Sequence, residues 1–241
     1  MVRSIKLIGL AFVAVLALGV VVASSASATP LIRFTANGPF TSDQISSLAI
    51  LETHEGGKVE CTKFPAKGSV TGEDKVHVLI EFENCKGPGG TTCTTTEGGS
   101  EVGTSGHIHV LALALLGSDT APPLDLPAVL ITTENKSDVP ANVTFKCQTF
   151  GIGAEITVKG SVIGLVSNLT SVTPGILLHL AKSGVGSQQD SHFWDESETN
   201  VLDLLFSVGT GTGGFAEQES SEEASALLLS TGSPISLIEV K

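Results

Sequence analysis

The segment VECTKFPAKGSVTGEDKVHVLIEFENC, residues 59–85, carries the clearest alternating strand of the chain and has a cysteine near each end, Cys61 and Cys85. Apolar and polar side chains alternate along its second half, Lys75–Glu83. The apolar set comprises Val76, Val78, Ile80 and Phe82. Because successive residues of a strand point to opposite faces, this pattern predicts a strand with one buried face and one mostly solvated face.

Turn-forming residues divide the same segment into three expected strands. Pro65 and the run Gly72-Glu73-Asp74 are typical of turns. The expected strands are Lys58–Lys63, Ala66–Thr71 and Lys75–Glu83. In a meander the first and third strands run parallel, so Cys61 and Cys85 would lie near the same end of the sheet. This geometry favours a Cys61–Cys85 disulfide.

Two further cysteines, Cys93 and Cys147, complete an even set. The segment Lys86–Gly106 is rich in Gly and Thr and is expected to form a long loop, which a Cys93–Cys147 bond would hold in place. Four cysteines allow three pairings, and we prefer this one together with Cys61–Cys85. A zinc site is the alternative, but no two of the cysteines have the CxxC spacing typical of zinc ligands.

The first residues have the composition of an export signal. Two basic residues, Arg3 and Lys6, precede the apolar run Leu7–Ala23. The small residues Ala26-Ser27-Ala28 follow this run and suit cleavage by signal peptidase. We expect a signal peptide over residues 1–28 and a mature domain over residues 29–241 that does not span a membrane. The alternative is an uncleaved membrane anchor, for which the apolar run is short. Export places the protein outside the cell or in the cell envelope, where disulfides form.

The charge balance is strongly acidic, with 25 Asp and Glu against 13 Lys and Arg. Two of those basic residues lie in the expected signal peptide, so the mature chain carries 11 basic and 25 acidic side chains, a net charge of −14. Nucleic acids and anionic lipid surfaces attract proteins largely through Lys and Arg on phosphate groups. We therefore exclude nucleic acid as a partner.

The rest of the mature chain consists of short apolar runs separated by turn residues. The further expected strands are Leu31–Phe34, Ser46–Glu52, His107–Leu116, Ala128–Thr133, Val143–Thr149, Ala154–Val166, Ile176–Ala181, Val201–Val208, Phe215–Gln218, Ala224–Leu229 and Ile235–Val240. Asn37-Gly38-Pro39 is expected to break the chain, and Gly160 to mark a bulge or bend. The density of turns predicts an all-β fold, a single sandwich-like or barrel-like antiparallel domain of about a dozen short strands with two disulfides.

Several motifs along the mature chain together resemble a known family. They are Cys61 with Gly68, Phe82-Glu83-Asn84-Cys85, Cys93 within a Thr-rich loop, Phe145-Lys146-Cys147, Val158–Gly164, Gln189 ahead of Phe193, and Gly213-Gly214-Phe215. In order and spacing they are similar to a family of small secreted β-rich proteins of unknown function from actinobacteria, especially Solirubrobacter-like soil lineages. The family carries no assigned activity, so the resemblance implies no reaction and no catalytic residue.

His107 and His109 are the sharpest local signal for a metal ligand pair. Side chains two residues apart on a strand share a face, so both imidazoles can reach one ion. No spaced third ligand is visible, and the alternative is a strand end that emerges from solvent ahead of Leu111 and Leu113. We expect no metal and no cofactor, with these two histidines as the weak candidates.

A group of carboxylates follows the aromatic pair Phe193-Trp194. It comprises Asp195, Glu196, Glu198 and Asp203. A glycoside hydrolase needs two carboxylates and an aromatic platform for the sugar, so a secreted hydrolase that uses this patch is the enzyme hypothesis. Acidic loops are more often solvated surface. A second acidic run receives that solvated interpretation: Glu217, Glu219, Glu222 and Glu223.

Catalytic motifs are otherwise weak. The serine of the run Gly160–Gly164 is misplaced for a GxSxG nucleophile elbow. This pattern favours a non-enzymatic binding or structural module, with the secreted hydrolase as the alternative. A core of Val, Leu and Ile can also enclose an apolar ligand. The expected partner is therefore a cell-envelope component or an apolar ligand.

Overall fold

In a computed structural model, the described residues fold into antiparallel strands and one short 3-10 turn, η1 (Pro88–Gly90), which confirms the all-β class. The structure describes residues 31–34, 37–72, 74–97, 105–118, 127–133, 142–149, 152–167, 175–188, 192–194, 200–202, 205–230 and 237–240. The predicted signal peptide lies outside these ranges.

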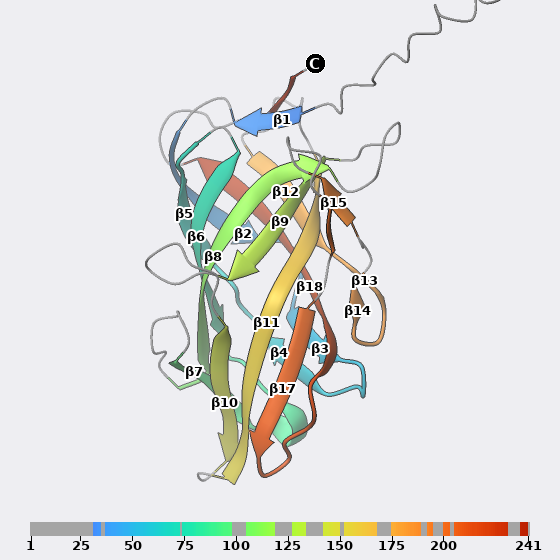
Figure 1. The fold of residues 1–241 in the computed structure, drawn as a ribbon. Helices are drawn as coiled ribbons and strands as arrows, with labels where there is room; N and C mark the ends of the chain where they lie inside the picture. Colours follow the sequence, from blue (N-terminus) through green and yellow to red (C-terminus); the bar gives the residue numbers. More distant parts are fainter. Residues whose placement is uncertain are drawn as a thin grey trace, which may run out of the picture.

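Eight strands close into an antiparallel barrel, which decides between the two expected architectures (Figure 1). Around the ring they are β5 (Ala66–Val70), β6 (Lys75–Glu83), β8 (His107–Ser118), β9 (Pro127–Thr133), β11 (Ile152–Ser167), β12 (Gly175–Leu180), β18 (Gln218–Ser230) and β2 (Gly38–Gln44). The ring closes because β2 pairs with β18 along one edge and with β5 along the other.

Two long strands, β11 and β18, continue below the barrel into a second tier (Figure 1). The strands of this tier are β3 (Ala49–Thr53), β4 (Lys58–Cys61), β7 (Thr92–Glu97), β10 (Val143–Thr149) and β17 (Leu205–Gly211). Lys86 bridges Glu60 of β4 and Thr92 of β7, so the lower tier closes through a single residue. The pairing of β11 with β17 ends at Gly160, where φ is 109°, and its pairing with β9 begins at Ser161, which fits the bend predicted there.

Side chains alternate between the inside and the outside of the barrel. The predicted apolar face of β6 points inward, as do Ile108, Val110, Ala114 and Leu116 of β8. On the opposite face of β6, Glu81 and Glu83 form surface ion pairs with Lys67 and Lys63. The alternation that the sequence shows in Lys75–Glu83 is therefore the alternation between core and solvent.

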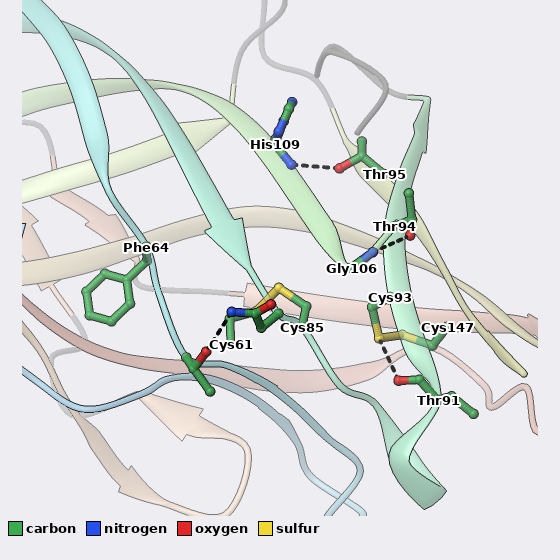
Figure 2. Close-up of a disulfide and its surroundings, with 12 residues drawn as sticks. Cys61, Phe64, Cys85, Thr91, Cys93, Thr94, Thr95, Gly106, His109 and Cys147 are labelled. Atoms are coloured by element: carbon green, nitrogen blue, oxygen red, sulfur yellow. Dashed lines mark hydrogen bonds between the residues drawn. A yellow bond between two sulfur atoms is a disulfide. The ribbon is translucent and has the colours of Figure 1, made fainter. Parts of the chain in front are cut away.

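The Cys61–Cys85 disulfide is present, although the meander that predicts it is wrong (Figure 2). The neighbours of β5 are β6 and β2, not β4. The end of β4 instead runs antiparallel to the segment after β6, because the amides of Glu60 and Lys86 each donate to the other residue's carbonyl oxygen at 2.8 Å. The next pair along this ladder is Cys61 and Cys85, whose Cα atoms are 4.1 Å apart. Such close pairs of antiparallel strands bring Cα atoms near enough for a disulfide.

The Cys93–Cys147 disulfide is also present, on a strand that was expected to be a loop. Within Lys86–Gly106, residues Thr92–Glu97 form β7, whose register with β10 places Cys93 opposite Cys147. The β-branched threonines of this stretch suit a pleated strand. Thr95 is fully buried, and its Oγ1 accepts a hydrogen bond from the amide of His109 at 2.7 Å, which attaches β7 to β8 (Figure 2).

Several strand boundaries differ from the expected ones. The expected strand Phe215–Gln218 is wrong, because only Gln218 lies in a strand, as the first residue of β18. The expected break at Asn37-Gly38-Pro39 is partly wrong, because Gly38 and Pro39 begin β2. The pairing of β2 with β18 begins only at Phe40. Pro39 therefore lies where β2 is not paired with β18, so no amide hydrogen is needed there for a bond to that strand. The expected strand Val201–Val208 is divided between β16 (Asn200–Leu202) and β17.

The remaining strands lie outside the two tiers. They are β1 (Leu31–Phe34), β19 (Leu237–Val240), β13 (Lys182–Gly184), β14 (Ser187–Gln188), β15 (His192–Trp194) and β16. β1 and β19 pair with each other at the upper end of the barrel (Figure 1). Phe34, at the end of β1, is 9% exposed and packs against Phe40, Val76 and Leu116 in the upper core. The short strand β1 thereby covers part of the barrel end.

Candidate functional site

The barrel interior is incompletely filled and holds two adjoining apolar cavities. The lower cavity has a volume of about 100 Å³ and the upper one a volume of about 90 Å³. Four residues line both cavities and mark where they meet: Ile80, Phe82, Ile131 and Glu222. A cavity of roughly 10–15 Å³ is enough to hold one water molecule. Each of these two cavities is several times larger than that.

The upper cavity is the more apolar of the two. Ser42 and Glu222 are the polar side chains among the described residues that line it. Aromatic rings contribute much of the wall, from Phe34, Phe40, Phe64 and Phe82. The lower cavity adds Thr133 and Ser161 and is bounded by the Cys61 end of β4. Apolar walls with a few polar groups are typical of small-molecule sites.

Glu222 is the charged side chain among the described lining residues of both cavities. Burial raises the pKa of this carboxyl to about 7, because the surrounding apolar groups disfavour its charged form. The residue keeps some accessible surface, and that surface faces the internal cavities rather than bulk solvent. A carboxyl group thus stands at the waist of an apolar barrel in a form that changes its charge near neutral pH.

The expected solvated position of Glu222 is wrong. Along β18, Glu222, Ala224 and Ala226 share the inward face and all line the upper cavity, whereas Glu223 points outward to the Nζ atom of Lys182. The sequence indicates this inward face through the period of two that joins Glu222 to the small apolar residues Ala224 and Ala226. The neighbouring carboxylates make the segment resemble a solvated acidic run, so the pattern is easily missed.

The two histidines proposed as metal ligands lie side by side on the outer face of β8. The ring centroids of His107 and His109 are 6.2 Å apart in an edge-to-face arrangement. Across the ladder they are opposite Glu83 and Glu81. Within the described ranges, no group of three or more His, Cys, Asp or Glu side chains is placed to hold a metal ion.

The carboxylates of the hydrolase hypothesis, Asp195, Glu196, Glu198 and Asp203, lie outside the described residues. Phe193 is described, and it is 1% exposed. It packs on the outer wall of the barrel with Ala128, Leu130 and Ile163. Its ring is therefore part of the packing of the barrel wall and is not open to a sugar.

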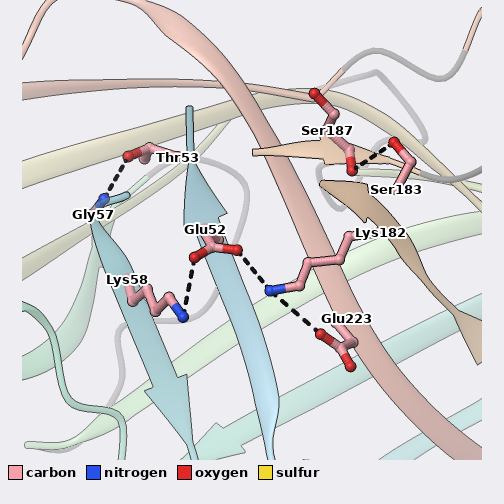
Figure 3. A network of polar contacts seen from close by, with 8 residues as sticks. All are labelled: Glu52, Thr53, Gly57, Lys58, Lys182, Ser183, Ser187 and Glu223. Atoms are coloured by element: carbon pink, nitrogen blue, oxygen red, sulfur yellow. Dashed lines mark hydrogen bonds and ion pairs between the residues drawn. The ribbon is translucent and has the colours of Figure 1, made fainter. Parts of the chain in front are cut away.

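A network of ion pairs lies on the outside of the lower tier (Figure 3). Glu52 of β3 receives Lys182 at 2.6 Å and Lys58 at 3.0 Å, and Lys182 also lies 3.6 Å from Glu223. The side chain of Glu52 is only 3% exposed. Its hydrogen bond with Lys182 lowers the pKa of Glu52, and the same bond raises the pKa of Lys182. The network fastens β13 to the barrel wall.

The Glu52→Gln variant is expected to lose about 1–2 kcal/mol of unfolding free energy at neutral pH, since both lysines lose their charged partner. A lowered pKa means that the stabilisation is present above the unfolded-state value of 4.5 and is lost as the pH falls through the folded-state value. Urea unfolding from neutral to acidic pH measures this, and the two proteins should converge in acid. The more exposed pair Lys146–Glu155 supplies the control, because Glu155→Gln should cost less than about 0.5 kcal/mol. Equal losses in the two variants would contradict the prediction.

No protein-family model, no curated protein and no solved structure matches this chain. The resemblance to the actinobacterial family therefore stays a prediction. Two disulfides are typical of proteins from oxidising, extracellular compartments. The described residues contain no apolar helix of the length that a bilayer crossing requires.

Proposed function

We propose that this chain is a secreted, non-enzymatic protein that binds an elongated apolar ligand inside its barrel. The observation that carries the proposal is the pair of adjoining cavities along the barrel interior, with apolar walls contributed by every strand of the ring. A structural module gains nothing from unfilled core volume, because each void forfeits packing contacts. The export signal expected in residues 1–28 and the two disulfides support secretion.

The form of the upper barrel end is compatible with ligand entry. Phe34 of β1, a strand outside the two tiers, lines the upper cavity. β1 pairs with the four-residue strand β19 and is itself four residues long, so a small set of hydrogen bonds holds this cover. Short, weakly paired elements open more readily than the long strands of the barrel wall.

Filling the upper cavity should block binding. Ala114 of β8 is 8% exposed and lines that cavity, so Ala114→Phe places a ring in the space that a ligand would occupy. The wild-type protein should bind the neutral fluorescent dye Nile red with blue-shifted emission, and Ala114→Phe should weaken its binding about tenfold or more. Fluorescence titration of the purified mature protein measures both dissociation constants.

The matched control is Leu113→Phe, which adds the same ring to the outer face of the same strand and should leave dye binding unchanged. Thermal melting of both variants separates a blocked cavity from a damaged fold, because overpacking destabilises by about 1–3 kcal/mol. Organic extraction of purified wild-type protein followed by mass spectrometry tests for a ligand carried from the cell. A folded protein that neither binds Nile red nor carries an apolar molecule would overturn the proposed function.

A further inference from the structure

The position of Glu222 carries an inference about ligand chemistry that rests on the proposed function. We propose that the barrel selects an apolar molecule with a basic amine, whose nitrogen is held by the Glu222 carboxylate at the waist of the barrel while its apolar body fills the upper cavity. A long-chain amine has this form.

The geometry places the polar group of the ligand. Glu222 lines both cavities at the level of Ile80, Phe82 and Ile131, so a ligand in either cavity meets the carboxyl at one end. The upper cavity offers an almost continuous apolar wall, whereas the lower one carries Thr133 and Ser161. An aliphatic chain therefore fits above Glu222, and a hydrated amine fits at the boundary with the more polar lower space.

Charge complementarity then selects the amine over other head groups. Glu222 is the charged side chain among the described lining residues, so an ammonium group entering the waist meets an opposite charge and no like charge from this lining. A hydrogen bond between two ions is roughly twice as strong as one between neutral groups. A fatty-acid carboxylate in the same place would face a like charge in a medium of low polarity, where repulsion is weakly screened.

The overall charge of the protein acts in the same direction. The chain carries 25 acidic against 13 basic side chains, so its field attracts cations and repels anions before they reach the barrel. The interior carboxyl and the acidic exterior are independent features, and both favour a cationic ligand over an anionic one.

Three probes with the same aliphatic chain test the proposal: dodecylamine, dodecanol and dodecanoate. Each is titrated against the Nile red complex of the mature protein at about pH 8, where the Glu222 carboxyl is mostly ionised and the amine mostly protonated, at concentrations below micelle formation. The wild-type protein should bind dodecylamine about tenfold more tightly than dodecanol, and dodecanoate more weakly than both.

Two variants assign the preference to its source. Glu222→Gln should bind dodecanol as the wild type does and lose the preference for dodecylamine. Glu223→Gln, which removes the adjacent outward carboxyl beside Lys182, should keep it. Dodecanoate binding as tightly as dodecylamine, or an equal loss of preference in both variants, would overturn the proposal. Nile red binding without any head-group preference would contradict this inference and leave the proposed function standing. If neither the dye nor any of the probes bound, the proposed function would be overturned as well.

Discussion

The Cys61→Ala/Cys85→Ala variant is expected to lose about 3.5 kcal/mol of unfolding free energy. The disulfide joins residues 24 positions apart, and closing a loop of that length lowers the entropy of the unfolded chain by an amount equivalent to about 3.5 kcal/mol. The Cys93–Cys147 bond spans 54 positions, so its removal should cost more, about 4 kcal/mol. Urea unfolding without reductant measures both losses.

Both disulfides lie in the large lower core. Cys61 and Cys85 are 4% and 0% exposed, and Cys93 and Cys147 are 0% and 2% exposed, so the removal of either pair also leaves a gap among packed side chains and the ranking by loop length is kept. The Cys61–Cys85 bond links the last residue of β4 to the chain just beyond β6, where the barrel joins the lower tier. Unfolding midpoints that match the wild type in either double variant would contradict the prediction, as would a larger loss from the shorter loop.

The Glu222→Gln variant is expected to be more stable than the wild type, by up to about 3 kcal/mol above pH 7. Because burial raises the folded-state pKa from 4.5 to about 7, the unfolded state releases its proton at a lower pH than the folded state does. Between those two values the wild type loses stability as the pH rises, by about 1.36 kcal/mol for each pH unit. Glutamine does not ionise, so the variant escapes this loss.

The pH profile distinguishes this effect from a general change in packing. The two proteins should have equal stability below about pH 4.5, diverge as the pH rises, and keep a constant difference above about pH 7. The control is Glu223→Gln, whose carboxyl lies outside beside Lys182 and should give no such gain. A difference between wild type and Glu222→Gln that does not vary with pH would contradict the buried-carboxyl assignment.

The Glu222→Gln substitution should raise the unfolding free energy and abolish the preference for an amine ligand, so the two experiments test opposite consequences of one charge. Without a ligand, the ionised carboxyl destabilises the barrel near and above neutral pH. With an ammonium group beside it, the same charge is neutralised and contributes to binding. A protein that keeps a destabilising group inside its core is consistent with a site whose complement arrives from solution.

Local sequence determined much of this fold. The alternation in Lys75–Glu83 predicts which side chains enter the barrel, because the two-residue period of a strand is a property of the backbone itself. The frequent turns predict the all-β class, and an even set of cysteines predicts two disulfides. Each of these follows from interactions between residues that are near one another in the chain or from the chemistry of a single residue type.

Only the tertiary structure decided the closure of the ring and the character of Glu222. β2 completes the barrel by pairing with strands that are far away in the chain: Gly38 pairs with Val70, 32 positions away, and Phe40 pairs with Ser230, 190 positions away. No local pattern specifies such partners, since any apolar strand can pair with many others. The same long-range pairing turns one carboxylate of an acidic run inward while Glu223 stays at the surface. Whether a charge is buried depends on what the rest of the chain places around it, and that is settled only when the barrel closes.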